Sequence, residues 1–371
     1  MPRPTITYME TRAAPHIRDG FNLDRALGLM LIAALPCLLW AVFNTGLQAN
    51  LQLEITGLGK APGWRGWFLA ALGVNPDPAS LTADLLHGML YVTPLLAVLL
   101  AVGWAWQWLF ARLRNRDMDP GLVLMALLFT LALPPGIALW QAALGFSFAI
   151  VIGREIFGGL GRNFLNPVLV GLAFLYVTYP GDLVGGIEWL QVDSISGATY
   201  YQETAGDAAK GISWGTSWLQ TFFGLTPSSV GANSAFASLV AAAVLLYARL
   251  ASARIMAGML LGMIAAAALF NIFSSEDNIY SVVSWHWHFV IGSFAFGMVF
   301  LATDPVSAAT TNQGRWIYGL LIGGLVVLIR VGNSAHPDGV IFAILIGNMF
   351  APLIDYVVTS LHIRRRVRRY G

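Results

Sequence analysis

Long apolar runs alternate with short polar connections along almost the whole chain. Because about 18 or more consecutive apolar residues suffice to cross a bilayer as a helix, these runs predict about ten membrane spans. The predicted spans cover about residues 26–43, 90–110, 122–139, 141–156, 164–179, 235–249, 255–273, 287–302, 316–330 and 339–358. The expected fold class is therefore an all-α polytopic membrane protein.

Composition supports this class and excludes one kind of cofactor. The 371 residues are 57% hydrophobic and only 11% charged, against roughly 25% charged in an average soluble protein. Cys37 is the single cysteine, so the chain can form no internal disulfide and cannot supply four cysteine ligands to an iron–sulfur cluster. We expect Cys37, beside Pro36 in the first apolar run, to pack as a small hydrophobic side chain.

Basic residues predict the orientation, since cytoplasmic loops carry an excess of arginine and lysine. With ten spans, one side receives Arg12, Arg18, Arg25, Arg112, Arg114, Arg116, Arg154, Arg162, Arg249, Arg254, Arg315 and the tail HIRRRVRRYG. Lys60, Arg65, Lys210 and Arg330 are the exceptions. Both termini are then cytoplasmic, and no removable signal peptide is expected at the N-terminus.

The long polar gap in the middle divides the spans into two groups of opposite orientation, which is the layout of an inverted repeat. We expect a cytoplasmic N-terminal segment (1–25), a first five-helix repeat (26–180), a periplasmic loop (181–234), a second five-helix repeat (235–358) and a basic cytoplasmic tail (359–371). Asn163 with Pro167, and Asn333 with Pro337, share a spacing of four near the starts of the fifth and tenth spans. The alternative is that proline and glycine commonly interrupt membrane helices without any repeat.

Two carboxylates lie at the depth or the edge of predicted spans. Asp304, in ATDPVSA, closes the eighth span, and Asp355, in APLIDYVV, falls within the tenth. A carboxylate in this environment indicates an ion or proton path by default. For Asp304, a helix cap before Pro-Val-Ser is an equal alternative.

The pair Asn163 and Asn166, in RNFLNP, is spaced i and i+3, which predicts a shared helix face. Paired amides suit a planar heterocycle such as a flavin or a quinone head. From the spacing alone, the favoured interpretation is structural: Asn163 caps the fifth helix, and Asn166 fills a gap before Pro167.

The histidines and the basic tail favour structural roles. His286 and His288, in SWHWHF, are two residues apart and face different sides of a helix, so they suit an interfacial aromatic belt better than a metal site. His87 and His336 are single residues at loop edges. The arginines of the tail suit contact with anionic membrane lipid rather than nucleic acid. The chain has no Walker loop, dinucleotide fingerprint or Ser/His/Asp arrangement that would bind ATP or NADH or act as a nucleophile.

The polar gap contains DSISGATYYQ, in which Thr199 follows Ser196, Gly197 and Ala198. DSISGAT closely resembles the flavinylation motif of the NqrB/RnfD family, the flavin-carrying membrane subunits of ion-pumping oxidoreductases. Further similarities run along nearly the whole chain, in RDGFNLDRAL, LPPGIALWQAALG, GREIFGGLGRNFLNP, WHWH, FAFGMVFLATDPVSA and APLIDYVV. SGAT alone would be weak, but these motifs in this order are specific.

The resemblance implies particular roles for these residues. Thr199 would carry FMN through a phosphoester made by a separate flavin transferase, with Ser196 as a competitor and Gly197 and Ala198 leaving room for the enzyme. Asn163 and Asn166 would contact non-covalent riboflavin. Electrons would pass from a partner's FMN to the FMN on Thr199, to riboflavin and then to ubiquinone. Asp304 and Asp355 would handle Na⁺.

The resemblance to the NqrB branch also implies a six-subunit complex in the bacterial inner membrane, with NqrA, NqrC, NqrD, NqrE and NqrF as partners.

One departure from the family pattern concerns the quinone region. The family's Gly-Gly-Phe-Trp-Glu is Gly103-Trp104-Ala105-Trp106-Gln107 here. Trp104 in place of glycine predicts a narrower pocket, and Gln107 in place of a carboxylate leaves protons as an alternative to Na⁺.

Three other functions compete with the NqrB one. The RnfD branch, part of a ferredoxin:NAD⁺ oxidoreductase, shares the flavinylated threonine, but WHWH, the polar segment near residues 50–87 and the basic tail resemble NqrB more. A urea- or ammonium-type channel would share the five-plus-five repeat but would not need a flavin acceptor. A purely structural subunit would tolerate Thr199→Ala without loss of electron flow.

Overall fold

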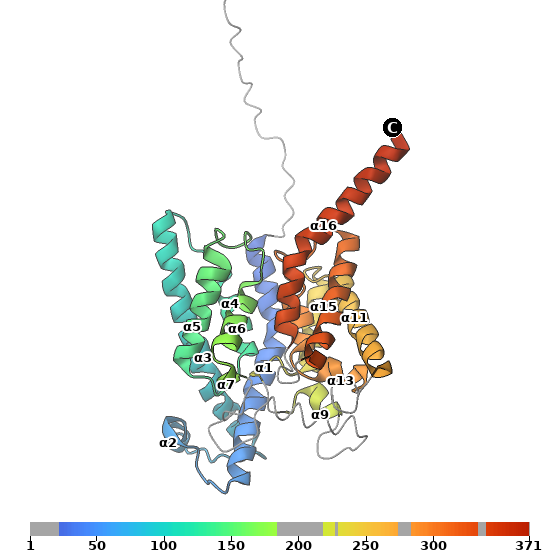
Figure 1. The fold of residues 1–371 in the computed structure, drawn as a ribbon. Coiled ribbons are helices and arrows are strands. Elements are labelled where there is room, and N and C mark those ends of the chain that lie inside the picture. The colour runs from blue at the N-terminus through green and yellow to red at the C-terminus, as the bar shows by residue number, and fades with distance from the viewer. Residues whose placement is uncertain (1–21, 184–217, 227–228, 274–282, 333–338, 371) are drawn as a thin grey trace, which may run out of the picture.

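The computed structural model describes residues 22–183, 218–226, 229–273, 283–332 and 339–370. In these ranges the chain is helical, without strands (Figure 1). The α-helices are α1 (Leu23–Ile55), α2 (Gly63–Ala71), α3 (Leu81–Arg114), α4 (Leu122–Ala132), α5 (Leu139–Ile150), α6 (Pro167–Thr178), α7 (Pro180–Leu183), α9 (Trp218–Phe223), α10 (Ala235–Tyr247), α11 (Ala253–Ile272), α13 (Trp285–Val290), α14 (Phe294–Phe296), α15 (Asn312–Gly332) and α16 (Val340–Tyr370). Two π-helical segments are η1 (Val151–Glu155) and η2 (Gly297–Leu301).

Five helices, α1, α3, α11, α15 and α16, are long and apolar enough to cross a membrane. The helices α4, α6 and α10 are apolar but shorter. These lengths and compositions make the chain a multi-pass membrane protein. Each of the ten predicted ranges overlaps helical structure, but the helices differ from the predicted spans in length and continuity.

The first and last helices are longer than predicted. The first span was expected to end at about residue 43, yet α1 continues to Ile55. Polar residues inside this extension are buried and bonded to other elements: Asn44 Nδ2 donates to Thr226 O (3.2 Å), and Asn50 Nδ2 donates to Asp84 Oδ1 (2.7 Å). Helix α16 runs on to Tyr370 and projects from the helical body (Figure 1).

The predicted third and eighth spans are interrupted. Helix α4 ends at Ala132, just before Pro134 and Pro135, where proline cannot continue the helical hydrogen bonding. The expected single span near 287–302 is divided into α13, α14 and η2, and Gly292 lies between them with φ of 69°. A residue in the left-handed backbone conformation ends a helix, and glycine adopts this conformation without steric cost.

A segment from the second half of the chain completes the broken end of α4. The N–H of Val230 donates to Leu133 O (2.8 Å), and the N–H groups of Gly231 and Ala232 donate to Leu131 O (2.9 and 3.0 Å). Carbonyls at a helix end within a membrane protein must find donors inside the protein, because lipid supplies none.

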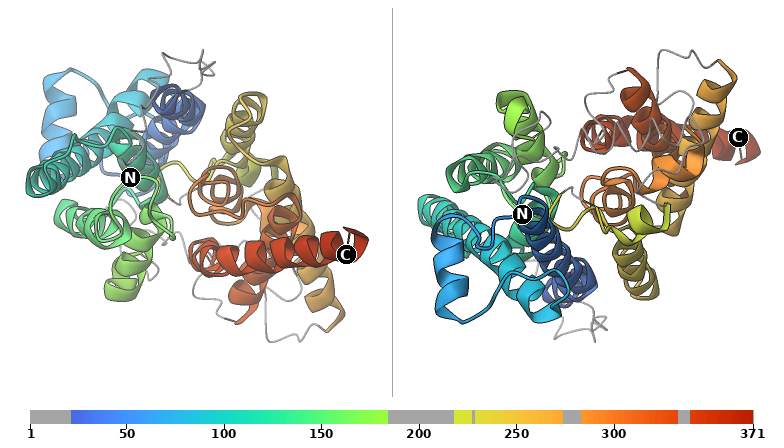
Figure 2. Two further views of the ribbon diagram at one scale, coloured as in Figure 1. Left: turned by 90° about the horizontal axis from the view of Figure 1, so that it is seen from above. Right: turned by 90° about the horizontal axis from the view of Figure 1, so that it is seen from below.

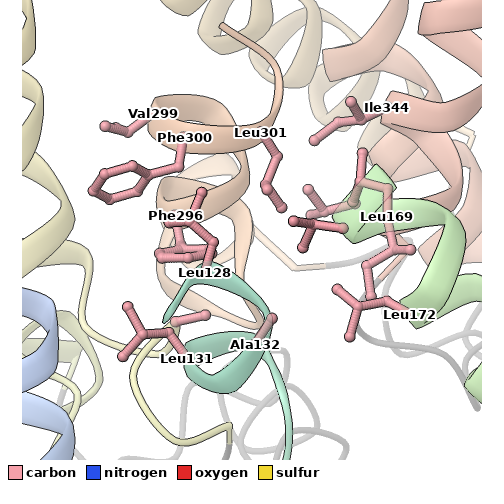
Figure 3. Packing of buried hydrophobic residues seen from close by; sticks show 14 of the residues in the cluster. Leu128, Leu131, Ala132, Leu169, Leu172, Phe296, Val299, Phe300, Leu301 and Ile344 are labelled. Atoms are coloured by element: carbon pink, nitrogen blue, oxygen red, sulfur yellow. The ribbon is translucent and has the colours of Figure 1, made fainter. Parts of the chain in front are cut away.

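The two halves of the chain form two groups of helices that meet in an apolar core. Helices α1–α6 gather on one side and α10–α16 on the other (Figure 2). Between them, Leu128 and Leu131 of α4 and Leu169 of α6 face Phe296 of α14 and Leu301 of η2 (Figure 3). Cys37 is fully buried in the same core, which confirms its predicted packing role.

Candidate functional site

The loop between η1 and α6 positions the two predicted asparagines. Both Asn163 and Asn166 are 5% exposed. The expected shared helix face is wrong, because α6 begins only at Pro167, the favoured first helical residue. Asn166 is the N-cap, and its Oδ1 accepts from the Val168 N–H at 3.0 Å. Asn163 precedes the helix, and its Nδ2 donates to Leu165 O at 2.9 Å.

Each amide thus uses one of its two polar atoms on the backbone. The oxygen of Asn163 and the nitrogen of Asn166 are the side-chain atoms left to meet a ligand. One acceptor and one donor, three residues apart in one loop, match the rim of a flavin ring, which alternates N–H donors with carbonyl acceptors. The two residues therefore fit the non-covalent flavin that the resemblance implies.

A charge network at the ends of α3 and η1 supports this loop. The buried Glu155 carboxylate accepts from Arg116 Nη2 at 2.7 Å and from Arg114 Nη1 at 3.2 Å. Arg116 also donates to Gly158 O at 2.6 Å. A Cβ on Gly159, where φ is 102°, would lie 2.5 Å from the Arg116 guanidinium. Glycine is therefore required there, both for its backbone angle and for the contact.

Asp119 ties the same network to the loop before α4. Its Oδ2 accepts from Arg154 Nη2 at 2.8 Å and from the Leu160 N–H at 3.0 Å. Burial acts to raise the pKa of the Asp119 carboxyl, but these hydrogen bonds and the charges of Arg154 and Arg116 hold the pKa below its usual range. The carboxylate is therefore ionised and fixed at neutral pH.

The predicted quinone residues lie on two different faces of α3. Gly103 is buried, and a Cβ there would lie 2.4 Å from Leu122 Cδ1, so glycine lets α3 approach α4. Gln107, one turn later, is also buried, at 3% exposure. Trp104 is 57% exposed on the outer surface, so within this chain its indole does not narrow a pocket beside Gly103.

Asp304 lies near the start of the connection between η2 and α15, and Asp355 of α16 contacts the end of this connection. Asp304 Oδ2 accepts from Ser307 Oγ at 2.7 Å, in the manner of the cap that the sequence offered as an alternative. Asp355 reaches across from α16 and accepts from the N–H and hydroxyl groups of Thr310 and Thr311, at 2.6–3.0 Å. The two carboxylates bracket one loop, and each has hydroxyl oxygens beside it.

Sequence reasoning missed two buried polar groups. His87, expected at a loop edge, is buried in α3, and its Nδ1 lies 2.7 Å from Asn50 Oδ1, within a chain that continues to Asp84. Arg330 is fully buried and donates to His288 O (2.6 Å) and Ile291 O (2.5 Å) at the end of α13. Two features of the sequence could have indicated these buried groups. Each is a polar residue inside an apolar helix, and Arg330 does not follow the predicted distribution of basic residues between the two membrane sides.

The predicted flavin attachment site, Thr199 with Ser196, Gly197 and Ala198, lies outside the described residues, as does His336. The flanking helices α7 and α9 are described, and both lie at the end of the molecule where α2 lies (Figure 1).

Comparison with known proteins adds family evidence to this geometry. Residues 10–364 match the model of the NQR2, RnfD, RnfE family. The chain is 44% identical over 362 residues to the B subunit of the Na(+)-translocating NADH-quinone reductase from Azotobacter vinelandii, covering 97% of this chain and 90% of that protein. The protein of the same name from Chromohalobacter salexigens is 44% identical (97% and 87% covered), and that from Neisseria meningitidis is 42% identical (98% and 92%). This match along nearly the full length places the chain in the NQR2, RnfD, RnfE family.

Proposed function

We propose that this chain is NqrB, the membrane-embedded flavin carrier of a Na⁺-translocating NADH:quinone oxidoreductase in a bacterial inner membrane. The observation that carries the proposal is the 42–44% identity, over at least 97% of the chain, to relatives that are named as this component of the complex. The family model alone also includes the RnfD branch. The partners would be NqrA, NqrC, NqrD, NqrE and NqrF, with a flavin transferase acting during maturation.

Thr199 is the proposed attachment residue for FMN. Its hydroxyl would form the phosphoester, and the small neighbours Gly197 and Ala198 would give the transferase access to it. Placement of the loop on the outer side is supported by α7 and α9, which flank residues 184–217 and lie at the end opposite the projecting end of α16 (Figure 1).

Asn163 and Asn166 are the proposed contacts for riboflavin. The Asn163 oxygen would accept a hydrogen bond from the ring, and the Asn166 nitrogen would donate one. The rigid charge network of Arg116, Asp119 and Glu155 would hold the loop, so that both amides keep their orientation without a change on binding. When bound, the flavins would supply stepwise electron transfer toward ubiquinone.

The quinone region and the ion path complete the proposal. The buried face of α3 that carries Gly103 and Gln107 is the proposed quinone side, and Trp104 would face lipid or a partner subunit. Asp304 and Asp355 are proposed for Na⁺ handling, since carboxylate and hydroxyl oxygens are the ligands that hard cations prefer. Na⁺ rather than H⁺ is proposed as the coupling ion because the relatives carry Na⁺ in their names.

We also propose ten crossings in two inverted five-helix repeats, with both termini cytoplasmic. Corresponding contacts support the repeat: α3 packs on α5 as α11 packs on α15, and α5 packs on α6 as α15 packs on α16. Across the middle, α1 contacts α10 and α6 contacts α16, which relates the first and fifth helices of the two halves to one another. The proposed segments remain 1–25, 26–180, 181–234, 235–358 and 359–371.

The test is in-gel fluorescence of the denatured chain after co-expression with a flavin transferase, with mass spectrometry of the peptide around Thr199. We expect a fluorescent band carrying the mass of FMN, abolished by Thr199→Ala and retained by Ser196→Ala. A dark band from a folded wild-type chain exposed to the transferase would contradict the flavin role. In that case, solute flux through the five-plus-five fold would be measured to test the channel alternative.

A further inference from the structure

Two buried asparagines from opposite halves of the chain share one backbone carbonyl. Asn44 of α1 and Asn233, just before α10, both donate through Nδ2 to Thr226 O, at 3.2 and 3.1 Å. Asn233 Nδ2 also donates to Gly224 O at 3.1 Å. These bonds fix the amide orientations, so the side-chain oxygen of each asparagine points away from the carbonyl it serves.

The same region contains oxygen atoms without partners. Asn233 Oδ1 and the hydroxyls of Thr45, Thr221 and Thr226 are buried and have no hydrogen-bond partner among the described residues. All four side chains are at most 2% exposed. Buried polar atoms are nearly always satisfied, and a bound water or ion is one explanation for an unsatisfied group in a native protein.

Hydrogen bonds join the segments that carry these groups, because Asn44, next to Thr45, and Asn233 both donate to Thr226 O. Thr221 O accepts from the Gly224 N–H at 3.0 Å, which folds the segment 221–226 into a tight turn beside Asn233. Thr45 follows Asn44 on α1, so helix α1 brings its hydroxyl to the same level. The cluster is therefore built from α1, the end of α9, and Thr226 and Asn233 between α9 and α10.

The cluster offers oxygens rather than nitrogens to a ligand. Both amide nitrogens are engaged by Thr226 O, and Asn44 Oδ1 already accepts weakly from Gln48 Nε2 at 3.4 Å. Neutral carbonyl oxygens replace the hydration shell of alkali cations in channel filters, and the amide and hydroxyl oxygens of this cluster are likewise neutral. A neutral ligand set also allows release, because conduction requires binding that is not too strong.

We propose that Thr45, Thr221, Thr226 and Asn233 form a binding site for one monovalent alkali cation between α1 and the segment before α10. The choice of Na⁺ as the natural occupant rests on the proposed function, whereas cation binding itself does not. The helical rise from Leu23 to Asn44 is roughly 30 Å, about the thickness of the hydrocarbon core. The site thus lies near the outer surface, where an exported ion would leave.

The experiment uses the purified full-length chain in detergent, without FMN, and measures its thermal unfolding midpoint as NaCl replaces choline chloride at constant ionic strength. The midpoint should rise with Na⁺ and rise less with K⁺. Thr226→Val removes one ligand oxygen with little change in volume and should raise the half-maximal Na⁺ concentration about tenfold. Thr226→Ser should restore the wild-type value.

Thr130→Val is the matched control, because the buried Thr130 hydroxyl already donates to Ala126 O (2.8 Å) in its own helix. Its Na⁺ dependence should equal that of the wild type. If Thr226→Val does not fold, Thr45→Val supplies the same test from α1. The proposal is overturned if Na⁺ gives no shift beyond choline, or if the threonine variants keep the wild-type Na⁺ dependence. Absence of FMN from Thr199 would count against the proposed function and leave this result unaffected.

Discussion

Individual charged residues that break the expected charge pattern are used inside the fold. Arg330 does not follow the predicted cytoplasmic excess of basic residues. Its guanidinium instead donates to two carbonyls at the end of α13. Arg65 lies over the ring of Tyr91, 3.9 Å from its centroid, and donates to Leu90 O at 3.4 Å. A cation near an aromatic face and a carbonyl is stabilised without a counter-ion. Both residues therefore join helices to one another rather than mark a membrane side.

Asp119 gives a pH-dependent prediction at the residue scale. Its folded-state pKa is below the ordinary value of about 3.9. The stabilisation is therefore fully present above that value and is lost as the pH falls through the folded-state pKa. Asp119→Asn should reduce the free energy of unfolding by about 1–3 kcal/mol at neutral pH. Thermal unfolding in detergent from pH 7 to about pH 3 measures both effects.

The difference between wild type and Asp119→Asn should shrink toward the acid end of this range. Asp117→Asn is the control, because Asp117 is exposed two residues away, and its stability should match the wild type at every pH. A constant gap between wild type and Asp119→Asn across the whole range would show that the Arg154 contact does not depend on the charge of Asp119.

At the scale of elements, glycine sets a close helix crossing. Helices α11 and α15 meet through Gly258 and Gly262 on one side and Gly319 and Gly323 on the other. A Cβ on Gly323 would lie 2.0 Å from Met259 O, and one on Gly262 would lie 2.3 Å from Leu320 O. Small residues spaced by four allow membrane helices to pack backbone against backbone.

Gly323→Ala should force these helices apart and lower the free energy of unfolding by about 1–3 kcal/mol, the usual cost of overpacking. The neighbouring Gly324→Ala is a sensitive control, because a Cβ there meets nothing within 4 Å. This control should be neutral or stabilising by up to about 1 kcal/mol, since alanine is the better helix former. The measurement is thermal unfolding of the two variants in one detergent. Equal effects would mean that the crossing is looser than described.

The apolar pattern was sufficient to locate helices but not their ends or interruptions. Hydropathy ended the first helix near residue 43, because Asn44 and Asn50 resemble loop residues until their partners Thr226 and Asp84 are known. Those partners lie 182 and 34 residues away, and no local pattern contains them. The division of the predicted eighth span at Gly292 depended on a backbone angle. Thr199 was identified only by resemblance.

At the scale of the molecule, the two halves depend on each other. Val230–Ala232 complete the end of α4, and the apolar core of Leu128, Leu169 and Phe296 is shared between the two groups of helices. We therefore expect one cooperative unit rather than two separable domains. The proposed sites for riboflavin and for the alkali cation then lie on a common rigid frame, with Asn163 before α6 and Asn233 before α10.

The orientation of this frame in the membrane can be tested directly. The start of α1 and the end of α16 lie at the same side of the molecule, whereas α2 lies at the opposite side (Figure 1). Single cysteines at Lys60, Asp117 and His362, all exposed, in a Cys37→Ala background should therefore divide between the two faces. A membrane-impermeant maleimide added to intact cells should label Lys60→Cys, whereas Asp117→Cys and His362→Cys should react only after the membrane is opened.

Wild-type Cys37 is the control for this labelling. It is fully buried and should remain unlabelled in the folded chain under both conditions, because a thiol must be accessible to react. Labelling of His362→Cys and Lys60→Cys from the same face would refute an arrangement in which α1 crosses once and both termini are cytoplasmic.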